Sequence, residues 1–108
     1  MFALDRFTLR LVYGIYGMLT YNYGFQLDDV RKFAEDGRIH DPVILHHNRG
    51  YTFFFKLADK DRLLDKCVLI TVKGARPREF KKARTYTRTL KANGISRWRV
   101  ERKEDAST

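Results

Sequence analysis

Apolar and polar positions alternate near the start of the chain with the two-residue period of a β-strand. Between residues 7 and 25 every odd position is apolar, aromatic or glycine: Phe7, Leu9, Leu11, Tyr13, Ile15, Gly17, Leu19, Tyr21, Tyr23 and Phe25. On a helix these side chains would scatter around the axis, whereas on a strand they share one face. The pattern predicts two strands, over about 7–13 and 18–23, with the turn between them at residues 14–17.

The following segment changes to helical spacing, which predicts a short helix over residues 27–36. Its apolar residues fall on one face: Leu27, Val30, Phe33 and Ala34. Asp28 and Asp29 stand in the first turn, where the helix dipole favours acids, and Gly37 follows as a C-terminal stop.

The middle of the chain carries strand signals. Two β-prone runs, residues 43–47 and 51–57, flank the connection Asn48-Arg49-Gly50 and predict a hairpin. We interpret the polar stretch 59–66 as a helical turn and the apolar run 67–72 as a central buried strand.

The last third is expected to hold a helix and a strand. Pro77 to Asn93 forms the helix in this interpretation, because proline suits the first helical position and Asn93-Gly94 suits the end. A strand should follow over residues 95–102. The resulting order is ββα-ββ-β-α-β, an α+β fold with two helices packed on a mainly antiparallel sheet. With 108 residues, we expect a single domain over 1–103 and a disordered tail at 104–108.

Cysteine usage and hydropathy favour a soluble cytoplasmic protein. The single cysteine, Cys67, excludes an internal disulfide, and its apolar neighbours indicate a small buried hydrophobe. The N-terminus lacks the features of a signal peptide. The longest apolar region, residues 9–19, is interrupted by Arg10, Gly14 and Gly17 and is too short to span a bilayer.

Positive charge is concentrated near the C-terminus. Residues 1–50 hold six Lys/Arg and six Asp/Glu, residues 51–72 hold four and three, and residues 73–103 hold twelve and two. Because the formal net charge of the chain is +9, almost all of the excess lies in residues 73–103. Such a concentration is typical of a surface that meets polyanions.

A helical wheel and strand alternation place these cations on candidate surfaces. On the predicted helix, Lys81, Arg84, Arg88 and Lys91 lie opposite an apolar face that includes Phe80, Tyr86 and Leu90. In the following strand, Arg97 and Arg99 alternate with Trp98 and Val100, and Lys73, Arg76 and Arg78 lie in a loop before the helix. We therefore predict ten nucleic-acid-binding residues: Lys73, Arg76, Arg78, Lys81, Lys82, Arg84, Arg88, Lys91, Arg97 and Arg99.

Other uses of these features stay open. The cations can form a solvated face or dock an acidic protein, whereas a membrane is disfavoured because the helix needs its apolar face for the core. Arginine suits phosphate and guanine contacts alike, so DNA and RNA are not distinguished. Four aromatic residues would suit base stacking but fit the core or a homodimer contact through the N-terminal strands better: Tyr21, Tyr23, Phe53 and Phe55.

Catalytic and metal-binding patterns are not found. His46 and His47 are adjacent, so on a strand they point to opposite faces, and no metal-ligand spacing includes them or His40. No cofactor motif occurs, and we expect neither a cofactor nor a metal. A metal-independent ribonuclease of the toxin type, using Tyr86, His46, His47 or Glu101 for proton transfer, shares the size and charge of the chain without a motif. We give priority to a non-enzymatic nucleic-acid-binding accessory protein; the alternatives are this ribonuclease and an inhibitor or adaptor that docks an acidic partner.

Overall fold

The computed structural model describes residues 14–16 and 19–102. The strand predicted over 7–13 and the tail predicted at 104–108 lie outside these residues. Within them, the elements follow in this order: β1 (Gly14–Tyr16), β2 (Leu19–Tyr21), β3 (Tyr23–Phe25), α1 (Leu27–Glu35), β4 (Ile39–His47), β5 (Gly50–Asp59), β6 (Arg62–Leu69), α2 (Ala83–Ala92) and β7 (Arg99–Arg102).

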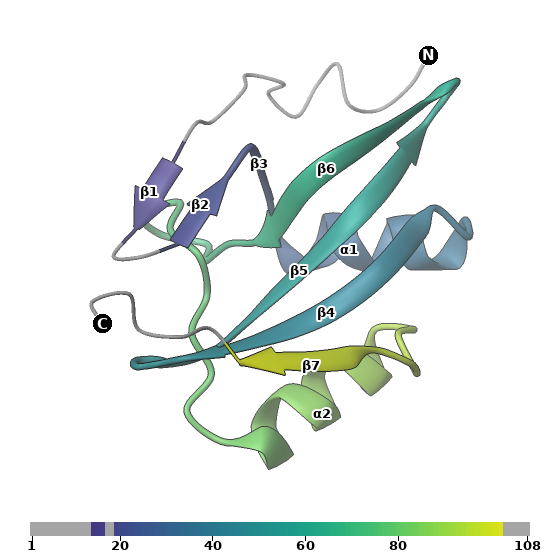
Figure 1. Cartoon of the computed structure of the whole chain (residues 1–108). Coiled ribbons are helices and arrows are strands. Elements are labelled where there is room, and N and C mark those ends of the chain that lie inside the picture. The colour runs from purple at the N-terminus through teal and green to yellow at the C-terminus, as the bar shows by residue number, and fades with distance from the viewer. Residues whose placement is uncertain (1–13, 17–18, 103–108) are drawn as a thin grey trace.

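Five of these strands form a mixed sheet in the order β3-β6-β5-β4-β7 (Figure 1). The central pairs, β6–β5 and β5–β4, are antiparallel, whereas the outer pairs, β3–β6 and β4–β7, are parallel. β1 and β2 form a separate antiparallel hairpin. The predicted α+β class with two helices is confirmed.

Both helices pack on the same face of the sheet. Tyr51 and Phe55 lie an even number of positions apart on β5, so they share a face. The ring of Phe25 lies 5.0 Å from that of Phe33 on α1 and 6.2 Å from that of Phe55, and the ring of Tyr86 on α2 lies 5.0 Å from that of Tyr51. The aromatic residues of β5 therefore join the two helices into one core.

Several expected elements are confirmed. α1 ends within one residue of its predicted end, and β4 and β5 form the predicted hairpin around residues 48 and 49. The fully buried Cys67 confirms its interpretation as a core residue, and burial raises the pKa of its thiol to about 12.

The helical turn predicted over residues 59–66 is wrong, because β6 begins at Arg62 and pairs antiparallel with β5. The strand pairing shifts register between Phe55 and Leu57, and Lys66 on the facing strand has a φ of 56°, in the left-handed region. This irregularity leaves Leu64 and Cys67, three residues apart, both buried. A three-residue spacing is the signal of a helix, which explains the error.

The second helix begins at Ala83, not at Pro77 as predicted. Residues 77–80 are extended instead, and their backbone pairs with Ile70 at Pro77 and with Tyr51 at Phe80. Phe80 is buried, with both of its backbone groups bonded to Tyr51 at 2.8 Å. These tertiary contacts outweigh the local preference of proline for a helix start.

The other boundary corrections lie at the two ends of the described chain. Gly14–Tyr16 is a strand, not a turn, and the second predicted strand divides into β2 and β3 at Asn22. Asn22 donates its backbone N–H to the carbonyl of Lys66 and so begins the pairing with β6. The last strand starts at Arg99, because Ile95 is buried in the core before β7 begins. None of the described helices is long and apolar enough to cross a membrane.

Candidate nucleic-acid interface

The exposed face of α2 carries a row of three cations. Arg84, Arg88 and Lys91 are four and three positions apart, so they lie on one side of the helix. All three are exposed, whereas Tyr86 and Leu90 on the other side are buried against the sheet. None of the three forms an ion pair with any residue that the structure describes. We call these residues the α2 row.

The segment before α2 is joined to the β4–β5 turn by charged groups. Glu79 lies 3.0 Å from Nε of Arg49 and 3.7 Å from Nζ of Lys81, and the Lys81 ammonium also donates to the carbonyl of Arg49 at 2.8 Å. The Glu79 side chain is only 17% exposed, whereas that of Lys81 is 70% exposed. One largely covered acid therefore orients two cations, and the site keeps a positive charge.

The turn itself needs glycine at residue 50. Gly50 has a φ of +131°, and a Cβ there would lie 2.3 Å from the carbonyl oxygen of Phe80. This close approach allows Tyr51 and Phe80 to pair through their backbones. It brings Arg49 against Glu79, which the sequence pattern did not predict because the pairing is tertiary.

The loop before this segment is a tight turn with two exposed cations, Lys73 and Arg76. Gly74 and Ala75 both have positive φ, at 82° and 47°, and the backbone N–H of Thr71 donates to the carbonyl of Arg76 at 2.8 Å. The Thr71 hydroxyl also donates to the carbonyl of Lys73. These bonds hold Lys73 and Arg76 at the exposed end of the turn.

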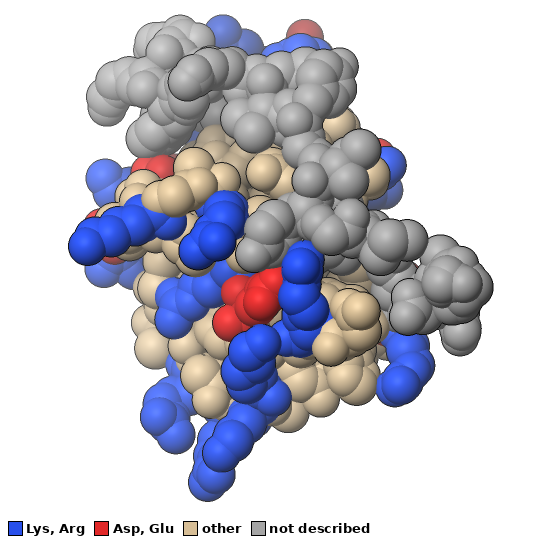
Figure 2. Space-filling view, turned by 90° about the vertical axis from the view of Figure 1, so that its left-hand side faces the viewer, with Lys and Arg blue, Asp and Glu red and all other residues tan. Residues whose placement is uncertain are grey.

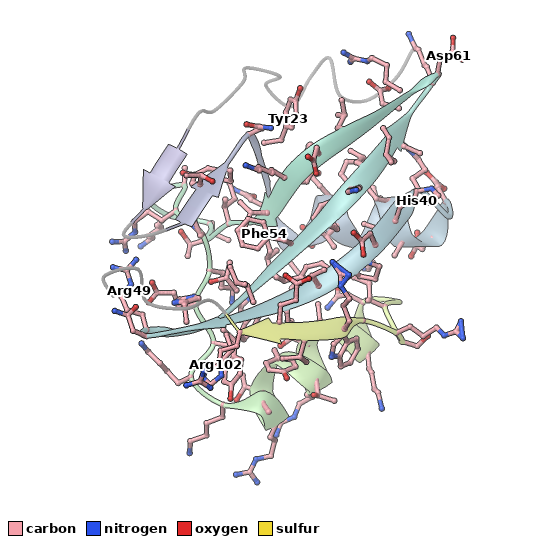
Figure 3. All side chains as sticks on the ribbon, in the orientation of Figure 1. Tyr23, His40, Arg49, Phe54, Asp61 and Arg102 are labelled. Atoms are coloured by element: carbon pink, nitrogen blue, oxygen red, sulfur yellow. The ribbon has the colours of Figure 1, made fainter. Side chains whose placement is uncertain are left out.

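The cations around these segments lie at one end of the molecule. Arg49 and Arg102 both lie at the end of the sheet where β4 and β7 finish, opposite to Asp61 and His40 (Figure 3). Viewed from that end, Lys and Arg side chains dominate the lower part of the surface around one acidic patch (Figure 2). We call the following residues the basic end: Arg49, Lys73, Arg76, Arg78, Lys81, Lys82, Arg84 and Arg102.

Two of the predicted residues, Arg97 and Arg99, lie elsewhere. Arg99 pairs with Val43, so it lies on the face of the sheet opposite to His46. Arg97 borders a hollow beside Ala34 and Ile39, near the start of β4. Arg99 lies 3.1 Å from Asp41 and 2.9 Å from Glu101, and it lines a cavity of about 370 Å³ on the sheet face that the helices leave open. Two acids thus surround the Arg99 guanidinium, and its charge is largely neutralised.

The three histidines do not form a common site. His47 is buried: its Nδ1 accepts the backbone N–H of Arg49 at 3.2 Å, so Nε2 carries the proton and donates to the Thr52 hydroxyl at 2.8 Å. His46 points to the helix-covered face, where its ring stacks on Tyr51, and His40 is exposed at the opposite end of the sheet (Figure 3).

The groups named for a ribonuclease are divided between the two faces of the sheet. Glu101 pairs with Leu45, so it lies on the face opposite to His46. Tyr86 is buried, and this burial raises the pKa of its hydroxyl. Within residues 14–16 and 19–102, no three His, Cys, Asp or Glu side chains are grouped to hold a metal ion.

The aromatic residues first considered for base stacking belong to the core. Tyr21, Phe53 and Phe55 are buried, and Tyr23 packs against the same cluster. The core interpretation of these residues is confirmed. The partly exposed rings near the basic end come from other residues, His46, Tyr51 and Trp98, which no local sequence pattern groups together.

Comparison with known proteins adds no family to this description. The chain matches no protein-family model, no curated protein and no solved structure.

Proposed function

We propose that this protein binds nucleic acid, DNA or RNA, through the basic end and the α2 row, as a non-enzymatic accessory protein. The observation that carries the proposal is the α2 row, in which Arg84, Arg88 and Lys91 stand exposed on one side of a helix. Among the described residues, no acid pairs with them, although Asp41 and Glu101 neutralise Arg99 elsewhere.

Electrostatics supports a polyanionic ligand. Like charges four residues apart, such as Arg84 and Arg88, destabilise a helix by a few tenths of a kcal/mol. The first turn of α2 contains no acid, and Lys82 precedes its free backbone N–H groups, which also favour anions. Phosphates along a nucleic-acid backbone would relieve the repulsion at several of these positions together.

Charge reversal on two helices tests the proposal with a matched control. Arg84→Glu with Arg88→Glu reverses two exposed cations on α2, and Arg31→Glu with Lys32→Glu makes the same total change of charge on α1. Fluorescence anisotropy with labelled DNA and RNA should show at least about a tenfold loss of affinity for the α2 variant. The α1 variant should lose much less.

Equal affinities of the two variants would exclude the α2 row as the binding surface. The same RNA samples, incubated with EDTA and run on a denaturing gel, are expected to stay intact. Cleavage would favour the ribonuclease alternative, and retention on an acidic protein without nucleic-acid binding would favour the adaptor.

A further inference from the structure

A cross-strand row of side chains runs across the basic end. Arg102 on β7 pairs with His46 on β4, His46 pairs with Tyr51 on β5, and Tyr51 pairs with Phe80 in the segment before α2. Residues directly opposite one another on neighbouring strands project to the same face. These four side chains, Arg102, His46, Tyr51 and Phe80, form a row that we call the aromatic row.

The rings in this row are in contact. The imidazole of His46 stacks on Tyr51 with ring centroids 4.3 Å apart and an interplanar angle of 16°. Tyr86 of α2 packs on Tyr51 from the helix side at 5.0 Å. Nη1 of Arg102 lies 3.3 Å from Nδ1 of His46, which orients the imidazole at the other end.

Exposure increases along the row toward β7. Phe80 and Tyr86 are buried, Tyr51 and His46 are partly exposed, and Arg102 is exposed. Trp98, with its ring 6.1 Å from that of Tyr86, is also partly exposed. The row therefore presents an imidazole, stacked on one side against a rigid support, at the molecular surface.

A cation contacts this partly exposed ring, and another lies on the helix that supports it. Arg102 contacts His46 directly, and Arg84 lies in the first turn of α2, the helix that carries Tyr86. A ligand that fits this surface has a flat ring for His46 and negative charge for its neighbours. Nucleotides joined by phosphates have both features in a repeating order.

We propose that the ligand is a single-stranded nucleic acid, with an unpaired base stacked on His46 and its flanking phosphates on the basic end. This inference rests on the proposed nucleic-acid binding. In a duplex, each base already stacks on its neighbours and its faces are closed to the protein, so His46 could receive only an unpaired base. The aromatic row would thus favour single strands over duplexes, whereas the cations alone would bind both.

Three probes of equal length separate the base from the phosphate: a single-stranded DNA with one 2-aminopurine, an abasic strand with the same phosphates, and a duplex. The single strand should bind about fivefold to a hundredfold more tightly than the abasic strand, the range expected for stacking of one base. Its 2-aminopurine fluorescence should be quenched on binding. The duplex should bind more weakly than the single strand.

Variants at residue 46 assign the effect to the aromatic row. His46→Ala should remove most of the difference between the single strand and the abasic strand, and His46→Phe should retain it because a ring remains. His40→Ala, which removes an exposed histidine at the opposite end of the sheet (Figure 3), should change neither affinity. Circular dichroism and urea unfolding verify that each variant is folded before it is compared.

The outcomes distinguish the two proposals. Equal binding of the single strand and the abasic strand, or tighter binding of the duplex, would overturn the inference about single strands and leave phosphate binding by the cations intact. An undiminished preference for bases in folded His46→Ala would overturn the stacking site itself. Binding of none of the three probes would overturn the proposed function as well.

Discussion

The carboxylate of Glu79 lies 3.0 Å from Nε of Arg49, and this contact joins the β4–β5 turn to the segment that leads into α2. The two residues are far apart in sequence but are brought together by the backbone pairing of Tyr51 with Phe80. Because the Glu79 side chain is mostly covered, the two charges attract each other more strongly than those of an ion pair on the open surface. It therefore connects the stability of the fold to the position of the basic end.

Replacing Glu79 with Gln should change stability and affinity in opposite directions. The substitution removes the charge that Arg49 and Lys81 share, and we expect a loss of about 1 to 2 kcal/mol in the free energy of unfolding. Binding of nucleic acid should become tighter, because one negative charge is removed from the basic end. Urea unfolding and fluorescence anisotropy measure the two effects.

Glu101→Gln is the matched control for this change. Glu101 pairs with Arg99, but both side chains are 51% exposed, so the loss should be below about 0.5 kcal/mol. Because Arg99 lies away from the α2 row, affinity should change less than in Glu79→Gln. A larger loss of stability at Glu101 than at Glu79 would contradict the coupling described above.

Gly50→Ala should be strongly destabilising. The new Cβ would lie 2.3 Å from the carbonyl oxygen of Phe80, and the φ of +131° is unfavourable for any residue with a side chain. We expect a loss of at least about 2 kcal/mol in the free energy of unfolding. Thermal or urea unfolding gives this value directly.

Gly37→Ala separates backbone strain from the close approach. Gly37 also has a positive φ, of +71°, but a Cβ there meets nothing within 4 Å. Gly37→Ala should lower the free energy of unfolding by about 1 kcal/mol, because only the left-handed conformation is unfavourable there. Equal losses at the two positions would show that the contact with Phe80 is not the cause.

Stability should depend on the protonation of His47. Burial lowers the pKa of His47, more than the nearby carboxylate of Glu79 raises it. At pH values below the ordinary pKa of about 6.5, the His47 imidazole of the unfolded chain therefore binds a proton, whereas that of the folded protein stays neutral until a lower pH. The contribution of His47 to stability is present above that pH and is lost as the pH falls through the lower value of the folded state.

Unfolding measured between pH 5 and 8 tests this dependence, with His47→Gln as the comparison. The wild-type protein should lose more free energy of unfolding than the variant on acidification from about pH 7 to 5. Identical pH profiles would contradict the bonded neutral imidazole, in which Nδ1 accepts from Arg49 and Nε2 donates to Thr52.

The sequence predicts an element correctly where its buried residues also repeat with the period of that helix or strand. Val30 and Phe33 fall on the buried side of α1, and the runs that became β4 and β5 alternate around a short turn. The exposed side of α2 also followed from spacing alone, since Arg84, Arg88 and Lys91 repeat with the helical period.

Other features depend on contacts between distant segments, which a local pattern does not contain. Phe80 is extended because Tyr51 pairs with it, so the helix expected from Pro77 begins at Ala83. Arg49 joins the basic end for the same reason, although nothing in the pattern around it indicates a charged partner. Arg99 was grouped with the helix by charge, but its pairing with Val43 places it on the other face of the sheet.

This division of the cations predicts which of them contribute to the salt dependence of binding. Each phosphate contact adds about 0.7 to 0.9 to the slope of log affinity against log salt concentration, the lower value applying to single strands. If Arg84 and Arg88 contact phosphates, Arg84→Gln and Arg88→Gln should each reduce the slope by about that amount. Affinity measured from low to high salt gives the slope for each variant.

Arg99→Gln provides the test against a diffuse charge effect, because it removes the same charge from the other face of β7. The guanidinium of Arg99 is already paired with Asp41 and Glu101, so it neutralises no phosphate and releases no counterion from the nucleic acid that binds at α2. Its slope should therefore stay close to that of the wild-type protein. Three equal reductions, at Arg84, Arg88 and Arg99, would mean that binding responds to total charge, and the assignment of phosphates to the α2 row would then be wrong.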